Sequence, residues 1–251
     1  SDSGDSVVNV SAISVEGVPV VGNTLTADPH GATVTYKWMK SDAKDGAYVA
    51  ISGATAKTYT LVEADADKWI KVEIKGTGNY TGTKTSDAVG PVLSKSEAAK
   101  ADFLAALKDK AKDITVAQVE IDDEDISVTF LSSAKISEVY DVAEELLDTF
   151  KEELEAAELT IILGEDEEET FNLEDADVVD IALYLLDGLS PGDFLAGEQT
   201  IEASYRAEAT VEGVTFSLAG SLKFQAIADP AVAAKADFLA ALKDKAKDIT
   251  V

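Results

Sequence analysis

The chain carries few of the side chains on which enzyme chemistry usually depends. It has no cysteine and a single histidine, His30, in the segment Asp28-Pro29-His30-Gly31. Because Asp, Pro and Gly favour turns, we expect His30 in a surface turn. No histidine metal cluster or catalytic triad is evident, and carboxylates are too numerous for one acid and base pair to stand out. The residue types therefore predict a protein that is not an enzyme.

Two acidic clusters have side chains suited to a hard cation. The first contains Asp122, Asp123 and Asp125, and the second contains Glu165, Asp166 and Glu168. Several carboxylate oxygens from one turn suit Ca²⁺. However, neither cluster has the spacing of an EF-hand or of a glycine-rich calcium repeat, and solvated hairpin turns are the other interpretation. We expect weak Ca²⁺ binding at most, and no other cofactor.

Charge narrows the class of partner. The formal net charge is -27, and residues 120 to 180 alone hold 23 acidic and 2 basic side chains. This charge disfavours nucleic acids and anionic membranes as partners, because both bind clustered Lys and Arg. Of the 21 basic residues only Arg206 is an arginine, so bidentate phosphate recognition is almost lost. No apolar run approaches the roughly 18 residues that span a bilayer, so we expect no membrane insertion.

An exact repeat is the strongest sign of how the chain is organised. Residues 98–116 recur without a mismatch as residues 233–251, at a distance of 135 residues. This distance is a plausible domain length, so residues 233–251 are expected to begin another copy of a module. The total of 251 residues favours two compact domains before that point.

Strand patterns fill residues 7–93. Short apolar segments alternate with Gly, Asn, Asp and Ser at the spacing of about 8 to 12 residues that is typical of an all-β sandwich. Within residues 34–39 and 69–74 one side of each strand is apolar, which predicts one buried face. We assign Trp38 to the core.

A series of motifs in this region resembles a known family. In chain order they are Val34-Thr35-Tyr36-Lys37-Trp38, Ile51-Ser52-Gly53-Ala54-Thr55, Thr58-Tyr59-Thr60-Leu61, residues 65–72 and residues 76–83. Over about residues 10 to 93 the chain resembles the bacterial immunoglobulin-like modules that are repeated in surface-layer and other cell-envelope proteins. The resemblance implies an immunoglobulin-like sandwich that acts as an extracellular spacer or adhesive module.

Residues 94–232 combine helical and strand patterns. A first helix is indicated by four apolar residues on one face, namely Phe103, Leu104, Leu107 and Ala111. The segments that follow are strands near 114–121 and 126–131, a helix near 135–157 and a strand at 159–163. An acidic turn then leads to a helix near 174–188, for which Asn172 is a credible N-cap.

The clearest strand pattern comes last. Apolar and polar residues alternate over 201–209 and 214–224 on either side of Glu212-Gly213, which predicts a long hairpin. The predicted fold class is therefore multidomain. An all-β immunoglobulin-like sandwich over residues 1–93 precedes an α+β module with an antiparallel sheet over residues 94–232, and residues 233–251 start a repeated copy of that module.

The repeated segment at residues 233–251 needs a surface to pack against, because a lone helix of this length is marginal in water. Its apolar residues are Phe238, Leu239, Leu242 and Ile249. One hypothesis is that the segment takes the place of residues 98–116 in a neighbouring chain, which would build head-to-tail chains by self-assembly. The alternative is that it rests on its own module.

Three classes of function are compatible with this organisation. We favour a non-catalytic structural or interaction segment of a secreted bacterial cell-surface protein, which meets copies of itself or neighbouring modules in scaffolding, self-assembly or adhesion. A second class is a module that binds a cell-wall glycan, a cation or a host protein; it requires aromatic rings such as Tyr36, Tyr59 or Tyr80 to be exposed rather than packed in the core. An enzyme, the third class, requires a concave site with converging catalytic groups.

Overall fold

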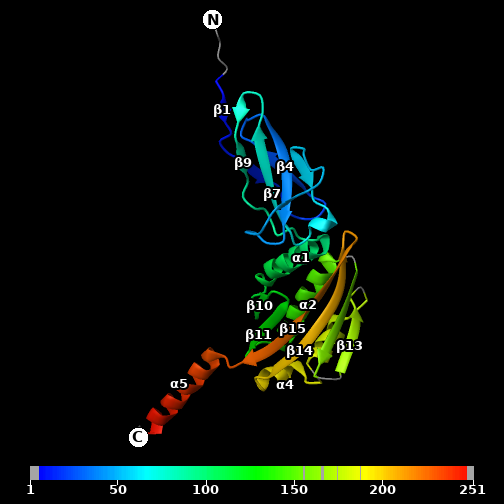
Figure 1. Cartoon of the computed structure of the whole chain (residues 1–251). Helices are drawn as coiled ribbons and strands as arrows, with labels where there is room; N and C mark the ends of the chain where they lie inside the picture. Colours follow the sequence, from blue (N-terminus) through cyan, green and yellow to red (C-terminus); the bar gives the residue numbers. More distant parts are fainter. Residues whose placement is uncertain (1–5, 155, 165–166, 174, 187, 248–251) are drawn as a thin grey trace. The chain divides into compact units, whose positions relative to one another are not determined.

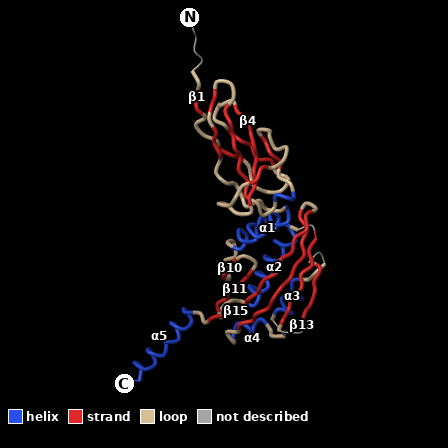
Figure 2. Tube along the Cα trace, in the orientation of Figure 1, coloured by secondary structure: helices blue, strands red, loops and turns tan. Residues whose placement is uncertain are grey.

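The chain divides into two compact units (Figures 1 and 2). The computed structural model describes residues 6–154, 156–164, 167–173, 175–186 and 188–247. The first unit is Ser1–Ala98 and the second is Ala99–Val251, and each has its own hydrophobic core. The fold is rich in β-strands, most of which pair in antiparallel sheets. The predicted boundary after residue 93 precedes the first α-helix, whereas the division between the units falls inside that helix.

The described residues of the first unit form three sheets. A three-stranded antiparallel sheet has the order β2 (Ser14–Glu16), β3 (Thr24–Asp28), β6 (Thr58–Thr60). A four-stranded antiparallel sheet has the order β5 (Val49–Ala50), β4 (Val34–Ser41), β7 (Trp69–Gly76), β9 (Thr83–Thr85). The short strands β1 (Val8–Asn9) and β8 (Tyr80–Thr81) pair in parallel. The short 3-10 helix η1 (Glu63–Asp65) follows β6.

Alternation along the strands builds the core of this unit. Strand β7 buries Ile70, Val72 and Ile74, while the residues between them are partly exposed, so the alternation predicted for residues 69–74 is confirmed. Trp38 on β4 is fully buried, as predicted, and its indole N–H donates to a backbone carbonyl at 3.0 Å. A buried indole thus keeps its hydrogen bond while its ring fills the core.

The second unit is built on one six-stranded sheet. Its order is β10 (Gln118–Asp122), β11 (Asp125–Leu131), β15 (Val214–Ile227), β14 (Thr200–Val211), β12 (Ala156–Leu163), β13 (Glu167–Asn172). All neighbours are antiparallel except β11 and β15, which run parallel. The prediction of an antiparallel sheet is wrong for this pair. No hairpin joins these two strands, and a long connection through helices lets them align in parallel.

The predicted long hairpin is confirmed as β14 and β15. The two strands pair from Thr200 opposite Gln225 to Val211 opposite Val214. The turn between them is Glu212-Gly213, with φ angles of 49° and 72°. A two-residue turn with both φ angles positive matches the twist of the paired strands, and glycine adopts such an angle without steric cost.

Four helices complete the core of the second unit. They are α1 (Lys95–Ala111), α2 (Ile136–Glu153), α3 (Val178–Leu185) and α4 (Pro191–Ala196). Alternate residues of β14 and β15 are buried, so one face of the sheet meets the helices and the other faces solvent (Figures 1 and 2). Phe103 of α1 packs on Phe216 with ring centroids 5.9 Å apart, and Phe194 of α4 packs on Phe130 at 6.3 Å. A fifth helix, α5 (Pro230–Lys247), follows β15.

The start of α3 differs from the prediction. Asn172 ends strand β13 instead of capping a helix. The N-cap is Asp177, whose carboxylate accepts a hydrogen bond from the Val179 N–H at 2.8 Å. Several Asn and Asp residues precede the helix, and all have side chains that can cap. Local sequence did not choose between them, because the pairing of β13 with β12 decides where the strand ends.

Two further elements were not predicted. Strand β13 (Glu167–Asn172) occupies a segment predicted as an acidic turn, and it pairs with β12 over its full length. A strand at the edge of a sheet can be built mostly from polar residues, so the sequence of β13 lacks the usual alternation of apolar and polar residues. Helix α4 (Pro191–Ala196) is short, and it begins with Ser190 as N-cap and proline at its first position, which is a favourable helix start.

Candidate functional site

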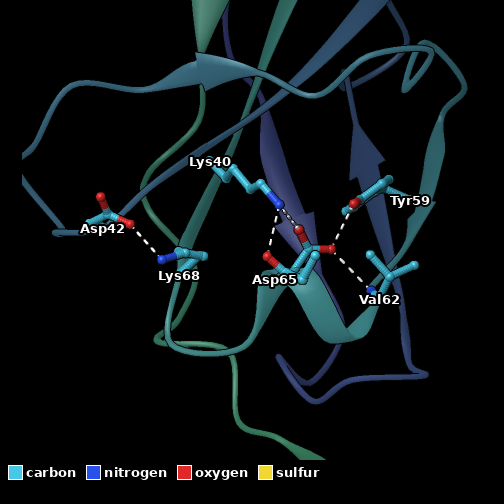
Figure 3. Close-up of polar contacts among 7 residues, drawn as sticks. Lys40, Asp42, Tyr59, Val62, Asp65 and Lys68 are labelled. Atoms are coloured by element: carbon cyan, nitrogen blue, oxygen red, sulfur yellow. Dashed lines mark hydrogen bonds and ion pairs between the residues drawn. The ribbon is translucent and has the colours of Figure 1, made fainter.

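Asp65, at the end of η1, is the only carboxylate that is buried among the described residues (Figure 3). The Lys40 Nζ donates to its Oδ1 at 2.7 Å. The Tyr59 hydroxyl donates to its Oδ2 at 2.7 Å, and the Val62 N–H donates to the same oxygen at 3.0 Å. Strand β4, strand β6 and η1 thus meet at one carboxylate.

These contacts keep Asp65 ionised. Burial alone would raise its pKa, but the hydrogen bonds from Lys40, Val62 and Tyr59 outweigh that effect and hold the pKa below its usual value. Burial and the neighbouring carboxylate raise the pKa of the Tyr59 hydroxyl, so this group stays protonated. An ionised carboxylate that accepts hydrogen bonds from fixed donors is better suited to holding the strands together than to transferring a proton.

The three tyrosines considered for sugar stacking are partly buried. Tyr36, Tyr59 and Tyr80 are partly buried and pack against the hydrophobic core of the first unit. The Tyr59 ring stacks on the buried Trp38 with centroids 5.7 Å apart. Each of these three rings therefore contributes to the packing of the first unit. His30 lies in an exposed turn, as predicted, with its backbone N–H bonded to the Asp28 carboxylate at 2.9 Å.

A different set of aromatic side chains lies on the outer side of the four-stranded sheet. The Lys71 Nζ is 4.4 Å from the centroid of the Tyr48 ring, and the Lys44 Nζ is 5.6 Å from the Trp69 ring. Tyr48, Trp69 and Lys71 are each half-buried. We name Lys44, Tyr48, Trp69 and Lys71 the lysine–aromatic cluster. Its sequence signal is the alternation of β7, which places Trp69 and Lys71 on the polar side of that strand.

The acidic turn between β10 and β11 has a structural task. The Glu124 carboxylate accepts hydrogen bonds from the Lys100 Nζ at 2.7 Å and from the Ala219 N–H at 2.5 Å. Asp125 Oδ1 accepts from the N–H and the hydroxyl of Ser221 at 2.7 and 2.8 Å. Both amides lie on β15 just before its pairing with β11 starts at Leu222. The two carboxylates therefore accept hydrogen bonds from β15 amides that lie beyond the end of its backbone pairing with β11.

Hydrogen bonding governs the charge of this turn. Burial would raise the pKa of Glu124, but the hydrogen bonds from Lys100 and Ala219 and the nearby Lys100 charge outweigh it, so the pKa is lowered. The two hydrogen bonds from Ser221 lower the pKa of Asp125. Lys100 lies on α1, so its ion pair with Glu124 also fixes this helix on the second unit.

The structure describes four of the six calcium candidates, and Asp122 lies opposite Asp125 in the pairing of β10 with β11. Asp122 and Asp123 are exposed, and Asp125 is engaged by Ser221. Glu168 pairs with Arg206 at 3.0 Å. The other two candidates, Glu165 and Asp166, lie outside the described residues. Within the part of the chain that the structure describes, no three His, Cys, Asp or Glu side chains form a group that could hold a metal ion, and weak Ca²⁺ binding stays a prediction.

Helix α5 carries the residues considered for self-assembly. Its N-cap is Asp229, whose Oδ1 accepts from the Ala231 N–H at 2.8 Å. Phe238 is 63% exposed and Leu239 is 46% exposed. Nothing is described for the side chain of Leu242, and Ile249 lies outside the described residues. The described part of α5 thus presents large apolar side chains to solvent, which is a feature of interaction surfaces.

Comparison with models of protein families gave no match, and comparison with curated protein sequences also gave none. Of the helices in the described residues, none is both long enough and apolar enough to cross a membrane. Two features of the described surface are suited to binding, the lysine–aromatic cluster and the exposed helix α5.

Proposed function

We propose that this chain is a non-catalytic structural segment of a secreted bacterial cell-surface protein, and that it acts in scaffolding, self-assembly or adhesion. The strand order of the first unit supports an immunoglobulin-like sandwich. The sheet β2-β3-β6 and the sheet β5-β4-β7-β9 share one core around Trp38. A seven-stranded arrangement of this kind, with a buried tryptophan on a central strand, is characteristic of immunoglobulin-like domains.

The second appearance of α1 as α5 is the observation that carries the proposal. Both are helices, and residues 98–116 and 233–251 have the same sequence. Repetition of a structural segment is how extended proteins are built from units that contact their neighbours. It serves no purpose in forming a single catalytic pocket, so it favours a serial architecture with extracellular modules of the kind that the first unit resembles.

The polar networks agree with a role without catalysis. Asp65, Glu124 and Asp125 have lowered pKa values because each accepts hydrogen bonds from groups held by neighbouring strands or helices. A general acid or base works best with a pKa near the working pH. The hydrogen bonds that lower these pKa values thus stabilise the fold and do not prepare the carboxylates for proton transfer.

Adhesion between coated particles tests this proposal. Beads carrying the full chain are mixed with beads of a second colour that carry the same chain, a purified cell-wall glycan or no protein. Self-assembly predicts mixed clusters between chain-coated beads, with bare beads left out. If chain-coated beads join neither each other nor glycan-coated beads at any coating density, the structural and adhesive proposal is wrong.

Glycan binding is the second candidate, and the lysine–aromatic cluster favours it. Half-exposed aromatic rings can stack on sugar rings, and the two lysines add affinity for acidic sugars. The double change Trp69→Ala and Lys71→Ala should then abolish clustering with glycan-coated beads. Lys84→Ala on β9 is the matched control, because it removes an exposed lysine outside the cluster. Equal loss of adhesion in both variants would argue against a specific glycan site.

A further inference from the structure

Helices α1 and α5 present the same apolar residues to different surroundings. Phe103 of α1 is 3% exposed, whereas its counterpart Phe238 of α5 is 63% exposed. Leu107 of α1 is fully buried, and its counterpart in the sequence is Leu242. The structure therefore shows, within one chain, a surface that fits this helix and a second copy of the helix whose described side chains, up to residue 241, are exposed.

Two contacts among the described residues mark the surface that receives α1. The Phe103 ring lies 5.9 Å from the Phe216 ring of β15. The Lys100 Nζ lies 2.7 Å from Glu124 Oε1 in the turn before β11. We name this surface, which includes Phe216 and Glu124, the α1 site. It combines an apolar floor with one acidic group, so it selects both the apolar face and the lysine of the helix.

Helix α5 is formed in the same register as α1. The Ser94 hydroxyl caps α1 by accepting from the Glu97 N–H at 3.1 Å, and Asp229 caps α5. Residue 229 follows residue 94 by the same 135 positions that separate the two repeats. The two helices thus start at equivalent positions. Phe238 and Lys235 therefore occupy the places on α5 that Phe103 and Lys100 occupy on α1.

We propose that α5 occupies the α1 site of a second copy of this chain. In that complex Phe238 packs on Phe216 of the other copy, and Lys235 pairs with its Glu124. The proposal deepens the self-assembly role and rests on it, because it names the surface through which copies join. Exchange of an identical element between copies is an economical route to assembly, since the receiving surface already exists.

Competition with the tethered α1 makes this link depend on concentration. The two helices make the same contacts, so only the tether favours α1, with an effective concentration on the order of 1 mM. At a chain concentration of about 10 µM, α5 should occupy roughly 1% of the α1 sites. At about 1 mM, α5 and the tethered α1 should occupy similar shares of these sites. Crowding of copies at one surface therefore favours the link, and dilution breaks it.

Weakening α1 alone provides the test. Phe103→Ala should lower the occupancy of the site by α1 roughly 100-fold or more, while α5 keeps its phenylalanine. Sedimentation velocity at about 10 µM should show the original chain as a monomer and the Phe103→Ala chain as assemblies. Adding Phe238→Ala to that variant should restore the monomer, and Phe238→Ala alone is the matched control. Assemblies that form equally with and without Phe238 would overturn the proposal.

Cysteine cross-linking keeps the test decisive if Phe103→Ala disrupts the second unit. The chain has no cysteine, so each introduced thiol is unique. A Lys235→Cys chain is mixed at about 1 mM with a Glu124→Cys chain or with a control Thr170→Cys chain. Each mixture is treated with a thiol-specific cross-linker with an arm of about 10 Å, because a direct disulfide needs Cα atoms within about 7 Å and the two long side chains hold the backbones further apart. The 2.7 Å contact of Lys100 with Glu124 predicts that only the first mixture gives a covalent heterodimer in high yield. Equal yields in both mixtures would refute the proposed docking.

Bead clustering separates this inference from the broader function. If chain-coated beads cluster and Phe238→Ala leaves the clusters unchanged, self-assembly stands but α5 is not its link. If Phe238→Ala disperses the clusters, both proposals are supported. If the original chain gives no clusters while the cross-link forms in solution, α5 docks as proposed but does not produce adhesion.

Discussion

Helices α1 and α5 are two regions with one sequence and two environments. Over residues 98–111 and 233–246 they are identical, and both are helical. Yet Phe103 and Leu107 lie in the core of the second unit, while Phe238 and Leu239 face solvent. Alanine, leucine and lysine favour a helix in either place, and each copy begins at a capping residue. The difference teaches that local residues form this helix, whereas packing decides how much it stabilises the protein.

Removing the shared phenylalanine should give the largest contrast. We expect Phe103→Ala to lower the free energy of unfolding of the second unit by about 3 to 5 kcal/mol, because it leaves a cavity in the core. Phe238→Ala should change it by less than about 0.5 kcal/mol in dilute solution, where its side chain is exposed. Urea denaturation followed by far-UV circular dichroism measures both. Equal effects would break the comparison between the helices.

The first unit offers a similar contrast between two Asp–Lys ion pairs, one with a buried carboxylate and one with an exposed carboxylate (Figure 3). Asp65 is buried beside Lys40, and Asp42 is exposed beside Lys68 at 2.6 Å. Asp65→Ala should cost about 3 kcal/mol, because it leaves the Tyr59 hydroxyl without its acceptor and the Lys40 ammonium with the Ala64 carbonyl but no counter-charge. Asp42→Ala should have little effect, because water screens that pair. Tryptophan fluorescence in urea reports on this unit, which holds both Trp38 and Trp69; similar midpoints for the two variants would contradict the prediction.

The ion pair that holds α1 should make the second unit sensitive to acid. The pKa of Glu124 is lowered in the folded state, so its contribution is complete above the unfolded pKa of about 4.3 and is lost as the pH falls through the folded pKa. We expect Glu124→Gln to cost about 1.5 kcal/mol at neutral pH and progressively less toward about pH 3. Thermal melts across this range test the trend, with the exposed Glu208→Gln as control. A cost that stays constant with pH would exclude the charge of Glu124 as its cause.

The capping residues should give the smallest effect and the finest comparison. Ser94→Ala should lower the free energy of unfolding by about 1 kcal/mol, because α1 is part of a packed core. Asp229→Ala should instead reduce the helical signal of α5 and shift the unfolding midpoint only as far as Ser133→Ala does, because the Asp229 carboxylate also accepts a hydrogen bond from the Ser133 hydroxyl. Amide hydrogen exchange resolved along the chain distinguishes local fraying from global unfolding. A larger shift of the global midpoint by Asp229→Ala than by Ser133→Ala would show that α5 stabilises the second unit.

Features that depend on neighbours in the chain could be predicted from the sequence. The alternation of residues 69–74, the core position of Trp38 and the turn at Glu212-Gly213 each have a local cause, either a period of two or a positive backbone angle. The apolar face of α1 is visible for the same reason, since Phe103 and Leu107 lie one turn apart. These signals survive in a single sequence because no distant partner is needed to create them.

Features that depend on distant partners could not be predicted. The parallel pairing of β11 with β15 joins residues almost one hundred positions apart, for example Ile126 with Leu222. Glu124 has no local mark that separates it from other acidic residues, since its role depends on Lys100 and on Ala219 of another strand. The exposure of Phe238 is the extreme case. Its local sequence is that of the buried Phe103, so no property of the segment itself distinguishes them.

The edges of the six-stranded sheet give the acidity of the second unit a further meaning. Strand β13 forms one edge and exposes Glu167, Glu168 and Glu169, and β10 forms the other and exposes Glu120 and Asp122. A sheet edge offers backbone hydrogen-bonding groups to any strand that approaches, which is the usual start of aggregation. Carboxylates on both edges repel the matching edges of other copies. Acidic side chains at both edges therefore disfavour pairing of this sheet with the sheet of another copy.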